Sequence, residues 1–191
     1  RQTGHLDLER RRGKGRWAQF FATFGSPEDM PGRSLWEVFL EEYALFRSEM
    51  DANADLVSFC RTGAEAEATF AAGKTAANAD LAAFCRTGAE AEAAFRSGRR
   101  AAFLSVEGAE LLDCDLDKLR LAHRMGVRIV NITWNHPNAL SGTNAEEQDR
   151  GLSEQGKAFV KTMGELGMLV DVSHLSDPGF WDVMEITDRP G

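Results

Sequence analysis

Short apolar segments alternate with helical segments along this chain of 191 residues, and this order constrains the fold more strongly than any other feature. The apolar segments that favour strands are residues 17–24, 101–106, 127–133 and 168–173. Helices are predicted to begin near Ser34, Asp115, Ser153 and Asp177. Such alternation is typical of βα units with parallel pairing. We therefore expect an α/β fold in which the four strands are adjacent, parallel and in chain order.

The ends of the predicted helices carry capping signals. Ser34 is followed three residues later by a glutamate, which is the spacing of a capping box. Asp177 is predicted to be an N-cap, because Pro178 would then occupy the first helical position. Gly126 and Gly167 are placed to end the helices that precede the third and fourth strands.

Two of the predicted strands end on a residue that can bind a metal. Glu107 follows residues 101–106, and His174 follows residues 168–173. Catalytic groups of a parallel α/β barrel lie where strands give way to the following loops, so a carboxylate and an imidazole at two strand ends can converge on one ion. Taken alone, each residue is more often structural. The pair indicates metal-assisted hydrolysis.

The composition argues against several classes of partner. A net charge of −8 disfavours nucleic acid or an anionic membrane as the main partner. A basic cluster at residues 10–16 is interpreted as a solvated loop, because no nucleic-acid-binding motif accompanies it. The chain contains no apolar run of about 18 residues, so no membrane-spanning segment is predicted. The three cysteines, Cys60, Cys85 and Cys114, follow no zinc or redox spacing, and their odd number is typical of reduced thiols in a cytoplasmic protein.

The middle of the chain contains a tandem duplication. Residues 53–70 recur as residues 78–95, with a shift of 25 positions. Two copies are too few for a repeat architecture, which needs about three to bury a continuous core. Each copy contains a Thr-x-x-Glu helix start, at Thr62 and at Thr87. We therefore predict that residues 53–101 are a duplicated helical segment within one domain.

The second half of the chain contains a series of motifs in a fixed order. They are Ser105-Val106-Glu107-Gly108, residues 119–126 leading to Val127-Arg128-Ile129-Val130-Asn131-Ile132-Thr133-Trp134-Asn135, Gly151-Leu152-Ser153, residues 163–168, and Asp171-Val172-Ser173-His174. Together they closely resemble the renal (membrane) dipeptidase family of zinc peptidases. The resemblance implies a (β/α)8 barrel whose mouth holds two zinc ions, and hydrolysis of dipeptides. Residues 1–191 would then be one incomplete metallohydrolase barrel domain of the α/β class, a partial TIM-type barrel that contains strands two to five of eight.

The resemblance also implies roles for individual residues. Glu107 is expected to be the catalytic carboxylate that bridges both metals, and His174 an imidazole ligand of the second. Trp134 and Asn135 are expected to contact the substrate, although Trp134 stands where some family members carry a substrate-contacting histidine. If Glu107 and His174 share an ion, their ligand atoms should lie about 3–4 Å apart, and up to about 6 Å apart without metal.

Other polar residues are weaker candidates. His5 and Asp7 have the His-x-Asp spacing of the family's first zinc site, but no buried strand precedes them, so we interpret them as loop residues. His136 follows a strand at a place suited to substrate contact. Asp171, three residues before His174, is a candidate for orienting the imidazole.

The remaining zinc ligands are therefore expected outside these residues, and the chain alone is predicted to lack dipeptidase activity. The rest of the barrel, or another copy of the chain in a homo-oligomer, would cover its open strand edges. Two alternatives stay open at this point: a non-catalytic relative, and a small-molecule-binding α/β protein without metal. The second has no glycine-rich phosphate-binding loop to support it.

Overall fold

The computed structural model describes residues 18–27, 30–52, 57–58, 82–84, 89, 92–93, 96 and 100–187. The chain divides into two compact units. One unit, called the larger unit below, contains Ala22–Ala44 and Leu104–Gly191. The other, the smaller unit, contains Arg1–Phe21 and Leu45–Phe103.

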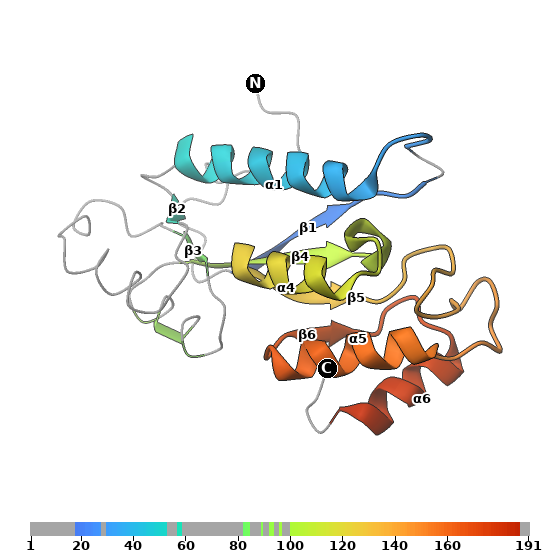
Figure 1. Ribbon diagram of the computed structural model, residues 1–191. Coiled ribbons are helices and arrows are strands. Elements are labelled where there is room, and N and C mark those ends of the chain that lie inside the picture. The colour runs from blue at the N-terminus through green and yellow to red at the C-terminus, as the bar shows by residue number, and fades with distance from the viewer. Residues whose placement is uncertain are drawn as a thin grey trace. The chain divides into compact units, whose positions relative to one another are not determined.

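Four of the described strands correspond to the four apolar segments of the sequence. They are β1 (Ala18–Phe24), β4 (Arg100–Glu107), β5 (Val127–Asn131) and β6 (Leu169–Asp171). Strand β4 pairs with β1 and β5, and β5 pairs with β6. The β4–β5 and β5–β6 ladders are parallel, and Figure 1 shows β1 pointing the same way. The prediction of four adjacent parallel strands in chain order is confirmed.

The carboxyl ends of these strands lie in register. Glu107 pairs with Asn131, and Asn131 pairs with Asp171. Thr23, near the end of β1, donates a hydrogen bond from its hydroxyl to the carbonyl oxygen of Ser105 at 3.2 Å. The loops after the strands therefore leave from one end of the sheet. Strands β5 and β6 end earlier than predicted, and the side chains of their last residues, Asn131 and Asp171, bond to backbone groups of the loops.

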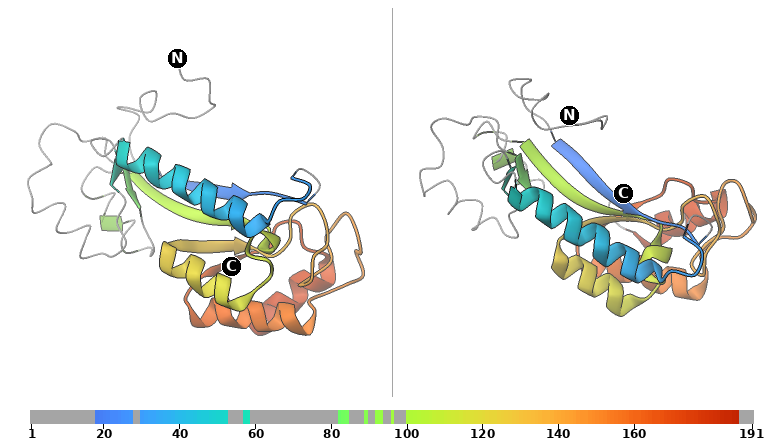
Figure 2. Two further views of the ribbon diagram at one scale, coloured as in Figure 1. Left: turned by 45° about the horizontal axis from the view of Figure 1, so that its top comes forward. Right: turned by 90° about the horizontal axis from the view of Figure 1, so that it is seen from above.

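Helices cover the strands of the larger unit. The described helices are α1 (Leu35–Ala52), the 3-10 helix η1 (Ala109–Leu112), α4 (Leu116–Met125), α5 (Glu154–Glu165) and α6 (Asp177–Ile186). Helix α4 packs against β5 and α5, and α5 packs against β6 and α6. The Tyr43 hydroxyl donates to the carbonyl oxygen of Met125 at 3.2 Å, which places the first part of α1 beside α4 (Figure 2). Among the described helices, none is both long and apolar enough to cross a membrane.

Local capping interactions explain the ends of α4 and α5. Asp115 Oδ1 accepts hydrogen bonds from the backbone N–H groups of Asp117 and Lys118, both at 2.9 Å. Gly126, with a φ of 113°, ends α4 in the left-handed conformation that glycine tolerates. Ser153 caps α5 through its hydroxyl. The predicted starts of these two helices, and the stop at Gly126, are confirmed.

The N-cap of α6 differs from the prediction by one position. Ser176 is the cap, and its Oγ accepts a hydrogen bond from the Gly179 N–H at 3.1 Å. Asp177 is the first helical residue, and Pro178 follows it in the first turn. Ser176 takes this place because its buried hydroxyl also donates to the carbonyl oxygen of Arg150 at 2.7 Å, whereas Asp177 is exposed.

Strands and helices of the larger unit share an apolar core. Its large, fully buried side chains include Phe39, Leu104, Leu111, Leu119, Ile132, Leu140, Phe159 and Met163. Burying a side chain of this size contributes about 1.5–3 kcal/mol. The core therefore fixes β4, which ends on Glu107, and β6, whose following loop contains His174.

The described residues of the duplicated segment are not all helical. Strands β2 (Val57–Ser58) and β3 (Ala82–Phe84) occur at equivalent places in the two copies. They pair in parallel, with Val57 opposite Ala82 and Ser58 opposite Ala83. These strands lie before the Thr-x-x-Glu motif of each copy, and the described residues after the second motif, 89, 92, 93 and 96, are helical. That residues 53–101 form a duplicated helical segment stays a prediction. That residues 1–191 form one incomplete domain stays a prediction.

Cys114 is expected to resist alkylation in the folded protein. Its side chain is buried, and burial, with a smaller contribution from the Glu110 carboxylate, raises the pKa of the thiol to about 12. The reactive thiolate is therefore scarce at pH 8. We expect iodoacetamide to modify Cys114 at least about 100-fold more slowly in buffer than in denaturant, as measured by mass spectrometry of its peptide. Equal rates in both conditions would contradict the buried position. Cys60 and Cys85 lie outside the described residues.

Candidate metal centre

Glu107 is the last residue of β4, at the point where the backbone leaves the sheet. The next residue, Gly108, has a φ of 89°, and the chain then turns into η1. A Cβ at Gly108 would also clash with the Glu110 carboxylate. Glycine at this position therefore allows the sharp exit that leaves Glu107 at the carboxyl end of the strand.

His174 lies in the loop between β6 and α6. Its φ of 67° is left-handed, which is uncommon for a residue with a side chain. The N–H of Asn144 donates to the carbonyl oxygen of His174 at 2.9 Å, and Thr143 forms an isolated β-bridge with Leu175. The segment before α5 thus holds the backbone of His174.

The two predicted ligands come together. Glu107 Oε1 and His174 Nε2 are 4.0 Å apart, within the range expected for two ligands of one ion. Both side chains are about one-third exposed, at 37% and 33%, so solvent reaches them. A carboxylate oxygen and an imidazole nitrogen are both ligand types that zinc accepts. Within the part of the chain that the structure describes, no cluster of three or more His, Cys, Asp or Glu side chains could hold a metal. By donor type, the Glu107 carboxylate and the His174 imidazole fit two of the ligand positions of a zinc ion.

Asn131 is the polar residue of this region that the sequence motifs left without a role. Its side chain is 3% exposed. Oδ1 accepts a hydrogen bond from the Gly108 N–H at 2.9 Å, and Nδ2 donates to the carbonyl oxygen of Ser173 at 3.0 Å. The feature of the sequence that could have identified Asn131 is that a polar amide occurs in the apolar strand that begins at Val127.

The expected substrate residues lie in the loop after β5. Trp134 is half-buried, and its ring meets that of Phe24 edge-on with the centroids 5.3 Å apart. Asn135 is exposed. The aromatic contact joins this loop to the end of β1.

The weaker candidates have other partners. His136 Nδ1 lies 3.1 Å from Glu146 Oε1, and both side chains are about half exposed. Asp171 Oδ1 accepts a hydrogen bond from the Ser173 N–H at 2.9 Å, so it stabilises the turn before His174 through the backbone. His5 and Asp7 lie outside the described residues.

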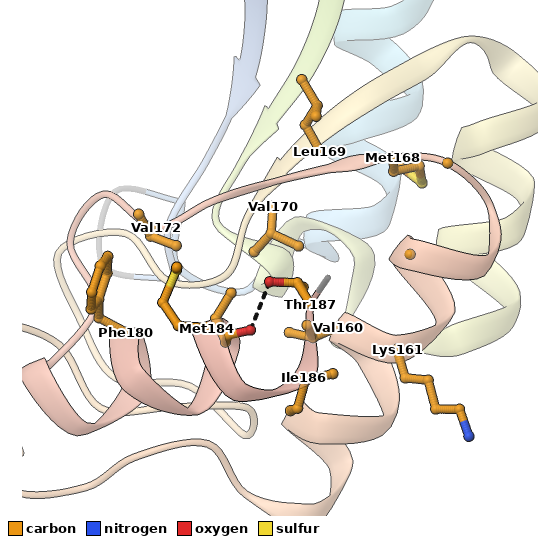
Figure 3. Close-up of a pocket in the computed structure, with 13 residues that line it drawn as sticks. Val160, Lys161, Met168, Leu169, Val170, Val172, Phe180, Met184, Ile186 and Thr187 are labelled. Atoms are coloured by element: carbon orange, nitrogen blue, oxygen red, sulfur yellow. Dashed lines mark hydrogen bonds between the residues drawn. The ribbon is translucent and has the colours of Figure 1, made fainter. Parts of the chain in front are cut away.

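A cavity of about 480 Å³ lies elsewhere in the larger unit, between β6, α5 and α6 (Figure 3). Its lining is mostly apolar and includes Val160, Val170, Phe180 and Met184. Of the lining residues only Lys161 is charged, and neither Glu107 nor His174 is among them. This cavity therefore lacks the carboxylate and imidazole groups that metal-assisted hydrolysis needs.

The part of the chain that contains Glu107, Asn131 and His174 matches a known family. A sequence model of membrane dipeptidase, peptidase family M19, matches residues 74–190, which is more than half of the chain. The chain belongs to the membrane dipeptidase family. An uncharacterized dipeptidase of Schizosaccharomyces pombe is 38% identical over 91 residues, covering 46% of this chain and 22% of the relative. The chain spans less than a third of the length of the curated relatives it matches.

Solved structures of membrane dipeptidase family members and their neighbours share the fold. The dipeptidase AC, a metallo peptidase of family M19, is 26% identical with a TM-score of 0.67, covering 98% of this chain and 52% of that one. A metallo peptidase from Rhodobacter sphaeroides, solved with a phosphinate mimic of L-Ala-D-Ala, is 24% identical with a TM-score of 0.71 and covers 98% and 55%. The chain thus has the α/β fold of part of a (β/α)8 barrel, as the sequence predicted.

Proposed function

We propose that this chain forms the central part of a zinc-dependent dipeptidase. The observation that carries the proposal is the meeting of Glu107 and His174 beyond the carboxyl ends of two parallel strands, in a member of the membrane dipeptidase family. In a barrel of this kind, this end of the strands is where active sites lie. The substrate class that we propose is therefore a dipeptide, and the reaction is hydrolysis of its peptide bond.

Glu107 and His174 are the described residues that would hold zinc. The complete enzyme would hold two ions, with Glu107 shared between them and the other ligands supplied from outside the described residues. The chemistry that zinc supplies when bound is Lewis-acid activation of water and of the scissile carbonyl. In this proposal Glu107 contributes one negative charge that offsets part of the charge of the cations, and the Nε2 atom of His174, which faces Glu107, contributes a nitrogen donor.

The loop after β5 would contact the substrate. Trp134 offers an aromatic face, supported from one side by Phe24, and suits an apolar side chain of a dipeptide. Asn135 is exposed and offers an amide that can both donate and accept hydrogen bonds. We propose that these residues orient the substrate while Glu107 and His174 bind metal.

The cellular location of the protein and the partner that covers its open strand edge are also proposals. A cytoplasmic location is supported by the free thiol of Cys114, because reduced cysteines persist in that compartment. Strand β6 has no described partner on its second edge, so either the rest of a barrel or a second copy of the chain would cover it. A non-catalytic relative is the alternative function, and the two-ligand set of the described residues favours it.

The 191-residue chain by itself is expected to hydrolyse no dipeptide, even with excess zinc, because two ligands do not hold the pair of ions that the reaction needs. Extended at both ends to the length of its relatives, the protein is expected to hydrolyse L-Ala-L-Ala or L-Ala-D-Ala in a chelator-sensitive way. Release of free alanine measures both. Chelator-sensitive activity of the 191-residue chain would show that the remaining ligands lie within it, and His5 and Asp7 would be the first candidates. An extended protein that binds zinc but cleaves no dipeptide would favour the non-catalytic alternative.

A further inference from the structure

The strands on either side of Asn131, β4 and β6, both leave the sheet just beyond it. Some of their backbone N–H and C=O groups therefore have no partner in the strand ladders. The ladder between β4 and β5 stops at the pair of Glu107 and Asn131, and Gly108 then turns away with a φ of 89°. The ladder between β5 and β6 stops at the pair of Asn131 and Asp171. Backbone groups just beyond these pairs need other partners, because an unpaired buried N–H or C=O is costly.

The Asn131 side chain supplies a partner on each side. Its Oδ1 accepts from the Gly108 N–H at 2.9 Å, and its Nδ2 donates to the Ser173 carbonyl oxygen at 3.0 Å. An amide can accept and donate at once, whereas an aliphatic side chain of similar size can do neither. The two partners also define which terminal atom is oxygen and which is nitrogen.

Each arm of this bridge ends one residue away from a proposed ligand. Gly108 follows Glu107 directly, and Ser173 directly precedes His174. Asn131 is 3% exposed, and its hydrogen bond to Gly108 is buried, whereas the bond to Ser173, an exposed residue, is partly buried. Fixing Gly108 against Ser173 therefore limits how far the Glu107 and His174 side chains, now 4.0 Å apart, can separate.

We propose that Asn131 is a positioning residue that holds Glu107 and His174 at a metal-binding separation by tying the backbone after β4 to the backbone after β6. The metal part of this inference rests on the proposed function, while the tie between the two loops does not. The two described hydrogen bonds of Asn131 go to backbone groups, so in this proposal it acts through the backbone.

Amide hydrogen exchange, measured without metal, tests whether Asn131 ties the backbone at Gly108 to the backbone at Ser173. Asn131→Leu removes both arms, so exchange of the Gly108 amide should accelerate about tenfold to a hundredfold. Asn131→Asp keeps an acceptor for Gly108 but loses the donor to Ser173. It should leave Gly108 within about threefold of the wild type and accelerate exchange of the Asn144 amide, which bonds to the carbonyl oxygen of His174.

Zinc affinity, measured by competition with a chromophoric chelator, tests positioning. Asn131→Leu is expected to lower the affinity of the 191-residue chain about 10- to 100-fold. The matched control is Thr162→Val, which removes another side-chain hydrogen bond of a buried residue, the partly buried bond from Thr162 to the Ala158 carbonyl oxygen at 2.9 Å in α5. It should change neither zinc affinity nor Gly108 exchange.

The possible results distinguish the two parts of the proposal, which are the hydrogen-bonded connection between the loops and the positioning of the metal ligands. Unchanged Gly108 exchange in Asn131→Leu would overturn the tie. Faster exchange with zinc affinity equal to that of Thr162→Val would assign Asn131 a structural role only and overturn positioning. If zinc affinity is insensitive to Glu107→Gln in the wild-type background, the proposed metal site fails and positioning fails with it, while the exchange results still decide the tie.

Discussion

Replacing Glu107 by glutamine is expected to lower the Zn²⁺ affinity of this chain by about 100-fold or more. Glutamine preserves the size of the side chain but removes its negative charge. His174 is then the stronger of the two described ligands that remain for the cation. Losing a partner outside the coordination sphere already costs about 10- to 100-fold in affinity, so losing a ligand should cost at least as much. Chelator competition measures the change.

In a protein extended to the length of its relatives, the same substitution should lower kcat/KM for a dipeptide about 10³-fold, or about 4 kcal/mol of transition-state stabilisation. Glu154→Gln is the matched control, because Glu154 is exposed at the start of α5 and pairs with Lys157 at 2.9 Å. It should retain both affinity and activity. His174→Asn should reproduce the affinity loss of Glu107→Gln. Wild-type affinity in either variant would contradict a shared ion.

Truncating Phe159 to alanine is expected to destabilise the protein by about 3–5 kcal/mol. Phe159 lies on α5 and is fully buried, so alanine there removes apolar contact and leaves a cavity. This loss is a large part of the stability of about 5–15 kcal/mol that is typical of folded domains. Urea denaturation followed by circular dichroism measures it as a lower midpoint at an unchanged slope.

Trp181→Ala is the control for the loss of an aromatic side chain. Trp181 lies on α6 with 65% of its surface exposed, and its described ring contact is with Phe180 at 5.2 Å. Its removal should cost no more than about 1.5 kcal/mol. Equal destabilisation by the two substitutions would contradict the placement of the core around α5.

The sequence was sufficient for features that depend on neighbouring residues. Asp115 and Gly126 bound α4 as expected, because a cap and a left-handed stop are made by groups within a few positions of one another. The N-cap of α6 shows the limit of such signals. Ser176 and Asp177 are both good caps by type, and the choice depends on the carbonyl oxygen of Arg150, which is distant in the chain.

The duplicated segment shows a second limit. The Thr-x-x-Glu motifs predicted helices that begin at Thr62 and Thr87. The sequence did not indicate that Val57 and Ala82, which precede these motifs, pair as strand residues. A run this short has no periodicity of its own, so its pairing depends on a neighbouring strand. The sequence therefore revealed the repeat but not the strand pairing between its copies.

For the candidate site, the sequence by itself determined which residue types stand at the strand ends, and so identified Glu107 and His174 and, through ordered motifs, the family. Only the tertiary structure decided that these two side chains lie 4.0 Å apart and that Asn131 joins their loops. The partners of Asn131 are 23 and 42 positions away in the chain. A side-chain amide has no preference for such partners until folding brings the ends of β4, β5 and β6 into register, and for this reason its role could not be predicted from local sequence.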